Sequence, residues 1–216
     1  MPISSKKGLV PAIINECIRQ EGWSLKKLYF IALISSLILV LGACSSGKKE
    51  GRPLNDFTFT DQDNNKLGLE DLKGKVWVAD FVFTNCATIC PPMTTNMSQL
   101  QSDVKEAGLK DVHFVSFSVD PEIDTPQALK DYGEKFGADF STWHFLTGYS
   151  QKDIEDFAVD NFKTLVKKPQ NDNQVIHGTT FFLINKDGEV IEEYQGNVDV
   201  PFKQIVKDIK SASKAD

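Results

Sequence analysis

Two cysteines, Cys86 and Cys90, stand four residues apart in the segment FVFTNCATICPPM. The spacing is one residue longer than that of C-x-x-C redox motifs. If a helix begins at or just before Cys86, both side chains lie on one face of it, with β-carbons ~5–6 Å apart. The positive end of such a helix lowers the pKa of the thiols. The pair can then act as a redox-active dithiol or bind a soft metal ion, depending on a third ligand.

Three histidines are available as that ligand. His113 and His144 each fall within a predicted strand, where a single histidine is most often packed, and we expect a structural role for both. His177 falls in the loop QVIHGTT, just before the penultimate predicted strand. A histidine in a loop near a thiol pair commonly binds a metal or acts as a base, which makes His177 the candidate.

The elements that position these residues follow from the hydrophobic pattern. Alternating polarity around a turn predicts an N-terminal hairpin over residues 54–69. We further predict strands at 76–83, 112–119, 143–146, 179–184 and 189–194, and helices at 93–108, 126–136, 153–162 and 202–213. This order predicts an α/β domain over residues 53–216 with a thioredoxin-like fold, extended by the N-terminal β-hairpin and ending in a β-hairpin plus helix.

In a thioredoxin-like fold, the loop before the penultimate strand faces the start of the cysteine-bearing helix. Thioredoxins and peroxiredoxins usually carry a proline in this loop, which keeps metals off the thiols, and this chain has none there. We therefore expect Cys86, Cys90 and His177 to form a site with two sulfur ligands and one nitrogen ligand. Such a site suits copper by ligand softness and zinc by ligand type. The alternative is that His177 only caps or hydrogen-bonds its own loop.

Four further residues near the cysteines call for an explanation. Met93 and Met97 continue the helical spacing of the cysteines, and we expect both to fill the core rather than bind metal. Asp80 lies inside an apolar strand, so it must face an edge or be paired. Asp120 precedes a proline, and we expect it to cap a turn, with support of a metal ligand as the alternative.

The N-terminal region predicts export from the cytoplasm. Residues 28–41 carry no charge and follow two lysines, but the run is shorter than the ~20 residues that span a bilayer. We therefore predict a signal peptide over residues 1–43. Residues 1–24 fit no signal peptide well, and we expect translation to begin near Leu25.

The sequence LGAC at 41–44 resembles a bacterial lipobox. It predicts lipidation of Cys44, a polar tether over residues 44–52, and a domain anchored to the bacterial cell membrane, facing outside the cytoplasm. An ordinary signal peptide with an incidental cysteine, or an uncleaved anchor, is the alternative. Because Cys17 lies in the removed segment, only Cys86 and Cys90 remain for the folded domain, in a compartment where disulfides persist.

Charge narrows the range of partners. Without residues 1–43 the chain keeps 19 basic and 28 acidic residues, a net charge of −9. Nucleic acid is excluded as a partner, because binding to phosphate needs a basic face.

Three segments, FTNCATICPPM, FSVDPEIDTP and VIHGTTFFLINKDGEV, together resemble the Sco/SenC family of copper-binding proteins for cytochrome c oxidase assembly. The resemblance covers the chain from about Pro53 onward and is closest to the lipid-anchored Sco proteins of Gram-positive bacteria. It implies copper ligation, as Cu(I) or Cu(II), by Cys86, Cys90 and His177. The family often has proline directly after the first cysteine, whereas this chain has Ala87, which affects helix entry but removes no ligand.

The resemblance implies a metallochaperone that delivers copper to the CuA centre of cytochrome c oxidase subunit II, reduces the cysteines of that centre, or does both. A thiol reductant or another copper chaperone is then an expected second partner. A thiol–disulfide oxidoreductase without an obligatory metal is the alternative function. Peroxidase chemistry is disfavoured, because it needs an arginine near the cysteine and the only one after residue 43 is Arg52.

Overall fold

The computed structural model describes residues 51–214, apart from residues 87 and 171. The predicted signal peptide, Cys44 and most of the predicted tether therefore lie outside the described residues. Within the described part, none of the helices is both long enough and apolar enough to cross a membrane.

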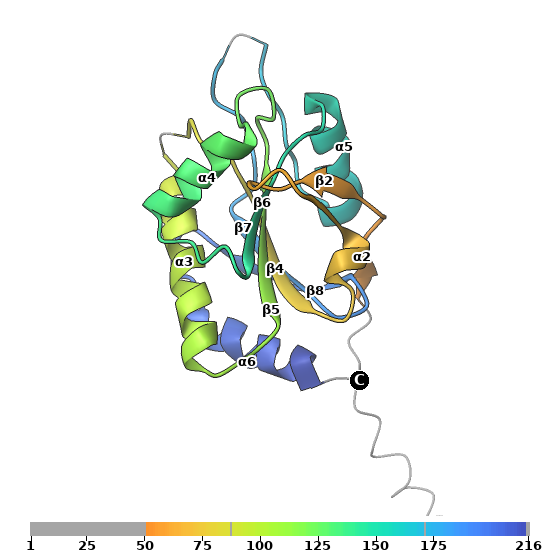
Figure 1. Ribbon diagram of the computed structural model, residues 1–216, viewed down its shortest axis with the longest axis vertical. Coiled ribbons are helices and arrows are strands. Elements are labelled where there is room, and N and C mark those ends of the chain that lie inside the picture. Colours follow the sequence, from red (N-terminus) through yellow and green to blue (C-terminus); the bar gives the residue numbers. More distant parts are fainter. Residues whose placement is uncertain (1–50, 87, 171, 215–216) are drawn as a thin grey trace, which may run out of the picture. The chain divides into compact units, whose positions relative to one another are not determined.

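A six-stranded mixed sheet forms the centre of the domain (Figure 1). Its strands run in the order β1-β8-β7-β4-β5-β6. Their bounds are β1 Arg52–Pro53, β4 Val76–Val82, β5 Val112–Ser118, β6 Trp143–Leu146, β7 Thr180–Ile184 and β8 Glu189–Gln195. The neighbours β4, β5 and β6 are parallel, whereas β7 is antiparallel to both β4 and β8. All of β4 is buried, as its apolar run predicts for a central strand.

Helices cover both faces of the sheet (Figure 1). One face carries α3 Cys90–Glu106, α4 Pro126–Lys135 and α6 Phe202–Lys214. The other face carries α5 Gln151–Phe162, the short α2 Leu69–Leu72, and the hairpin of β2 Thr58–Thr60 with β3 Lys66–Gly68. Each face has its own hydrophobic core, one of which includes Phe117 and the other Phe114, three residues earlier in β5. The predicted thioredoxin-like α/β fold is confirmed.

Helix starts follow the capping chemistry of the sequence. The hydroxyl of Thr125 accepts a hydrogen bond from the backbone N–H of Ala128, which fixes the start of α4 where it was predicted. Ser150 and Asp153 form a reciprocal capping box, so α5 begins at Gln151, two residues before its predicted start.

The condition set for the cysteine pair, a helix that begins at or just before Cys86, is not met. Helix α3 begins at Cys90, and Cys86 lies in the turn between β4 and that helix. Proline lacks the N–H that a helix interior uses and clashes with the preceding turn, so Pro91 and Pro92 fit only the first turn. These two residues therefore fix the start of α3 directly in front of them.

Candidate metal centre

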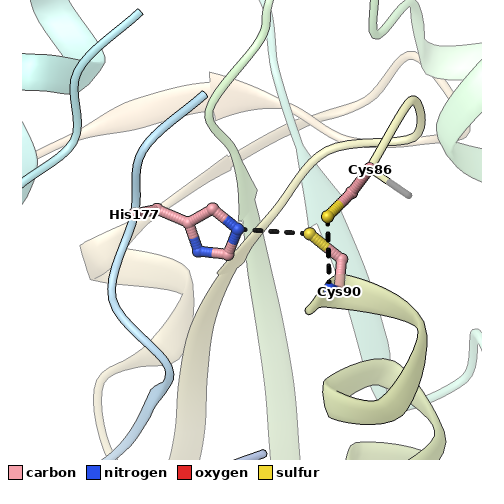
Figure 2. Close-up of side chains that lie close together, drawn as sticks. All are labelled: Cys86, Cys90 and His177. Atoms are coloured by element: carbon pink, nitrogen blue, oxygen red, sulfur yellow. Dashed lines mark hydrogen bonds between the residues drawn. The ribbon is translucent and has the colours of Figure 1, made fainter. Parts of the chain in front are cut away.

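Cys86, Cys90 and His177 come together at the ends of the central strands. Their ligand atoms, two sulfurs and one ring nitrogen, all lie within 4.8 Å of one another, and all three side chains are buried. Figure 2 shows the His177 ring pointing from its loop towards both sulfurs. Cys86 comes from the turn after β4, Cys90 is the first residue of α3, and His177 lies in the loop before β7.

The start of α3 acts on Cys86 even though Cys86 lies outside the helix. The backbone N–H of Cys90 donates to the Cys86 sulfur at 3.3 Å (Figure 2). A hydrogen bond from the Cys90 thiol lowers the pKa of Cys86 despite its burial, and the backbone N–H groups of Thr88 and Cys90 act in the same direction. The pKa of Cys90 is raised, because its proton serves this bond and the side chain is buried. Both cysteines are free, so the pair holds one ready thiolate and one thiol.

The imidazole of His177 is held as a ligand-competent tautomer. Its Nδ1 lies 2.9 Å from the carbonyl oxygen of Gly178. A carbonyl can only accept, so Nδ1 carries a hydrogen, and Nε2 is the nitrogen that faces the sulfurs. Nε2 lies 3.2 Å from the Cys90 sulfur. The ring thus hydrogen-bonds its own loop and still presents its second nitrogen to the sulfurs, which is the usual support of a metal-binding histidine.

Asp124 fixes the turn that carries Cys86. Its buried carboxylate accepts bonds from the hydroxyls of Thr84 and Ser118, both at 2.6 Å, and from the backbone N–H of Thr84 at 3.2 Å. Burial raises the pKa of Asp124, although these hydrogen bonds act to lower it. Sequence reasoning missed this residue. The available signal was an acid just after the end of β5, the edge where α/β folds commonly place their sites.

Ion pairs hold the loop that carries His177. Lys168 reaches the carboxylate of Asp120 at 2.7 Å, and Lys167 reaches Glu155 at 2.7 Å. Gln174 donates to the backbone carbonyl of Asn85, one residue before the first cysteine, at 3.2 Å. The Asp120 carboxylate thus pairs with a lysine, while its backbone carbonyl accepts the turn bonds that were expected of this residue.

Of the two expectations for Asp80, the edge position is wrong, and the partner is a neutral hydroxyl rather than a charged group. Asp80 lies in the central strand β4, is fully buried, and accepts one bond from the hydroxyl of Ser116 at 2.6 Å. Its second oxygen finds no hydrogen-bond partner among the described residues. Burial raises the pKa of Asp80 to about 7, so neutralisation takes the place of a counter-ion.

The remaining candidates lie apart from the three ligands. Met93 and Met97 are fully buried, as expected of core residues. Their core lies on one face of the sheet, and the core that includes both cysteines lies on the other face. His113 and His144 lie on β5 and β6 and contact each other. Arg52 pairs with Glu193 in β8.

Comparison with known proteins places these features in a family pattern. A family model described as SCO1/SenC matches residues 46–214. The SCO1 protein homolog of Bacillus subtilis (strain 168) is 47% identical over 185 residues, which cover 84% of this chain and 95% of that protein.

Solved structures agree with this match. A SCO1/SenC family lipoprotein from Bacillus anthracis str. Ames has a TM-score of 0.75 and 52% identity, over 78% of this chain and 99% of its own. BsSco, a member of the Sco family of cytochrome c oxidase assembly proteins in which a disulfide switch was identified, has a TM-score of 0.72 and 47% identity, over 78% and 98%. Copper-bound ScoI from Arabidopsis thaliana has a TM-score of 0.63 and 28% identity, over 73% and 98%.

Proposed function

This chain belongs to the SCO1/SenC family, and from that premise we propose that it binds copper through Cys86, Cys90 and His177 and delivers it during assembly of cytochrome c oxidase. Sco proteins include oxidase assembly proteins, and a relative has been solved with copper bound. The acceptor we propose is the CuA centre of oxidase subunit II, with copper as cargo rather than as a resident cofactor.

The observation that carries this proposal is the convergence of three ligand atoms within 4.8 Å, from positions up to 91 residues apart. Two sulfurs and one imidazole form a soft donor set, which favours copper over hard cations such as magnesium or calcium. The lowered pKa of Cys86 favours its thiolate, and Nε2 of His177 already faces the sulfurs, so both can ligate from the positions they hold. Burial of all three limits the access of competing water.

A second candidate function uses the same thiols as a reductant. The lowered pKa of Cys86 favours it as the attacking thiolate on a disulfide of the acceptor. Cys90 then resolves the mixed disulfide, so that the acceptor gains two thiols and this chain keeps a Cys86–Cys90 disulfide. An external thiol reductant must restore the dithiol, which is the partner we propose for this route.

We also propose that the domain acts at the outer face of the bacterial cell membrane, tethered through a lipid on Cys44. The B. anthracis relative is described as a lipoprotein, which supports this location. Under this proposal residues 1–43 are removed as a signal peptide, residues 44–52 form the tether, and residues 53–216 form the thioredoxin-like domain. Mass analysis of the mature N-terminus tests the assignment: a lipidated Cys44 is expected, and a mature chain that keeps residues 1–43 contradicts it.

A transfer assay separates delivery from reduction. The reduced chain, loaded with one copper, is mixed with the apo CuA domain of subunit II in two forms, one with its cysteines reduced and one with them as a disulfide. Delivery predicts CuA absorption from the reduced acceptor with wild type, little with His177→Ala, and an unchanged yield with the control Met97→Leu, which removes a sulfur outside the site.

The other outcomes contradict delivery. A pure reductase gives no CuA absorption with the reduced acceptor, and converts the disulfide acceptor to thiols equally well with wild type and His177→Ala. Failure of both reactions with a correctly folded protein overturns both functions.

A further inference from the structure

His113 and His144 meet because of the register of the parallel strands. Val115 of β5 pairs with His144 of β6, so His113, two residues earlier in β5, points to the same face as its diagonal neighbour. The rings are nearly parallel, with an interplanar angle of 11° and centroids 5.6 Å apart. Nδ1 of His113 lies 3.4 Å from Nε2 of His144. Two nitrogens that can ligate a metal therefore face each other across one short gap.

The separation of these nitrogens fits one shared ion. An ion ~2.0–2.1 Å from both nitrogens, the zinc–imidazole distance, makes an N–metal–N angle of about 108–116° at this separation. That angle is close to tetrahedral. The ion lies to one side of the line between the nitrogens, so each ring has to turn to direct its lone pair at the ion. We propose that His113 and His144 form a second metal site, which binds one divalent ion of borderline softness, with zinc as the ion that its angle fits.

The charge state of the rings agrees with this role. Burial lowers the pKa of His113 to about 4 and lowers the pKa of His144, so both rings are neutral at neutral pH, as metal ligands must be. Lys75 acts in the same direction on both rings. Nearby carboxylates act to raise these pKa values and also attract a cation. They belong to Asp61 and Asp63 near His144 and to Asp111 near His113.

Ion binding needs a tautomer change but no loss of a proton. In the metal-free pair, one ring donates its N–H to the other ring, so one facing nitrogen carries hydrogen. Binding moves that hydrogen to the other nitrogen of the same ring. Among the described residues Nδ1 of His144 has no hydrogen-bond partner, so in His144 this change breaks only the bond between the two rings.

The second site is separate from the candidate metal centre. His113 pairs in register with Trp77, near the start of β4, whereas the cysteines follow Val82 at its end. Five residues of strand separate Trp77 from Val82, which is about 17 Å at ~3.3 Å per residue. Both rings are partly exposed, so water can fill the two remaining tetrahedral positions. We therefore expect weaker and more exchangeable binding than at the three-ligand centre.

The test uses zinc as the probe and a full chain stripped of every competing sulfur and imidazole ligand. Replacing Cys17, Cys44, Cys86 and Cys90 by Ser and His177 by Ala leaves His113 and His144 as the only histidine or cysteine ligands. Equilibrium dialysis is expected to show one saturable zinc per chain. Adding His113→Gln or His144→Gln is expected to weaken that binding at least tenfold, with an unchanged melting temperature in chelator showing that the fold is intact.

Two results overturn the proposal: no saturable zinc in the stripped chain, or equal zinc binding with and without the glutamine substitutions. If the stripped chain does not fold, the wild-type chain is first filled with one Ag(I), which the thiolates prefer, and the zinc titration is repeated on it. His144→Gln must then remove one zinc from the stoichiometry of the silver-filled chain. An unchanged stoichiometry is equally decisive against the site.

Discussion

The candidate metal centre and the histidine pair assemble their ligands by opposite routes. The centre draws Cys86, Cys90 and His177 from a turn, a helix start and a distant loop. The pair draws His113 and His144 from neighbouring parallel strands. The first route makes a soft, buried, three-ligand set, and the second a partly exposed pair of borderline ligands. The ligand atoms are similarly spaced in the two sites, but the different ligand types favour different ions.

The two regions also differ in how their imidazoles are held. Nδ1 of His177 donates to the Gly178 carbonyl, which fixes its ring and tautomer. Nδ1 of His144 has no partner among the described residues, so its tautomer is free to change. Fixed ligands lose less freedom on binding, so we expect copper at the centre to be held far more tightly than any ion at the pair.

The largest expected effect follows from loss of a sulfur ligand. Cys86→Ser or Cys90→Ser replaces a soft thiolate by a hydroxyl, and we expect Cu(I) affinity to fall by more than about a thousandfold, well beyond the 10–100-fold typical of lost supporting contacts. Competition with a chromogenic chelator measures this, with Met97→Leu as the sulfur-loss control. A fall of less than tenfold in either serine variant breaks the assignment of that sulfur.

Loss of one imidazole comes next and compares the two regions directly. His177→Ala is expected to lower Cu(I) affinity by about a hundredfold, because one ligand and its fixed orientation are lost. The Cys86–Cys90 disulfide should still form under oxidising conditions. In the same assay His144→Gln should leave copper affinity unchanged. Equal effects of the two substitutions would remove the distinction between the sites.

A smaller effect is expected from Asp124, which touches no ligand. Asp124→Asn keeps one acceptor for the bonds from Thr84 and Ser118 but loses the second, which loosens the turn before Cys86. We expect about a tenfold loss of Cu(I) affinity, the low end for supporting contacts. Glu122→Gln, which removes an exposed partner of Lys168, is the control and should change nothing. An unchanged affinity in Asp124→Asn refutes its positioning role.

Asp80 lies in the protein interior, and we expect its substitution to change the stability of the fold rather than the affinity for copper. Its folded pKa of about 7 lies above the unfolded value of 3.8. Between these values the unfolded chain loses the proton while the native state keeps it, so stability falls as pH rises from about 4 to 7. Asp80→Asn should remove that fall. The free energy of unfolding of the variant, relative to wild type, should therefore be higher at pH 8 than at pH 4 by on the order of a few kcal/mol.

Urea denaturation of the metal-free, reduced protein at pH 4 and pH 8 measures this difference. Ser211→Ala, at an exposed position of α6, serves as a control whose stability difference from wild type should not depend on pH. A difference between wild type and Asp80→Asn that is the same at both pH values shows that Asp80 ionises normally in the folded state.

Much of the molecule could be predicted from its sequence, because local signals agree with the fold. The apolar run of β4, the Thr125 cap and the hairpin before β8 each specify their element. The meeting of His177 with the cysteines could be predicted only through the fold, since loop position has no local signature. The helix after Pro91 and Pro92 was predicted from its periodicity, and because proline is tolerated in the first turn, α3 begins at Cys90, three residues before the predicted start.

The rest depends on tertiary relations that no short segment encodes. Pairing of His113 with His144 requires both the neighbour relation of β5 and β6 and their register, and a shift of one residue would turn one ring to the other face. Neutralisation of Asp80 depends on complete burial, with Ser116 as its only hydrogen-bond partner among the described residues. The role of Asp124 depends on two hydroxyls 6 and 40 residues away.

The most direct test of the central claim is X-ray absorption at the copper edge. The reduced chain is loaded with one Cu(I), and the scatterers around the metal are counted in wild type, His177→Ala and His144→Gln. We predict two sulfurs and one imidazole in wild type, loss of the imidazole signal in His177→Ala, and no change in His144→Gln. A copper centre without imidazole in wild type, or an imidazole signal that survives His177→Ala, would contradict the account.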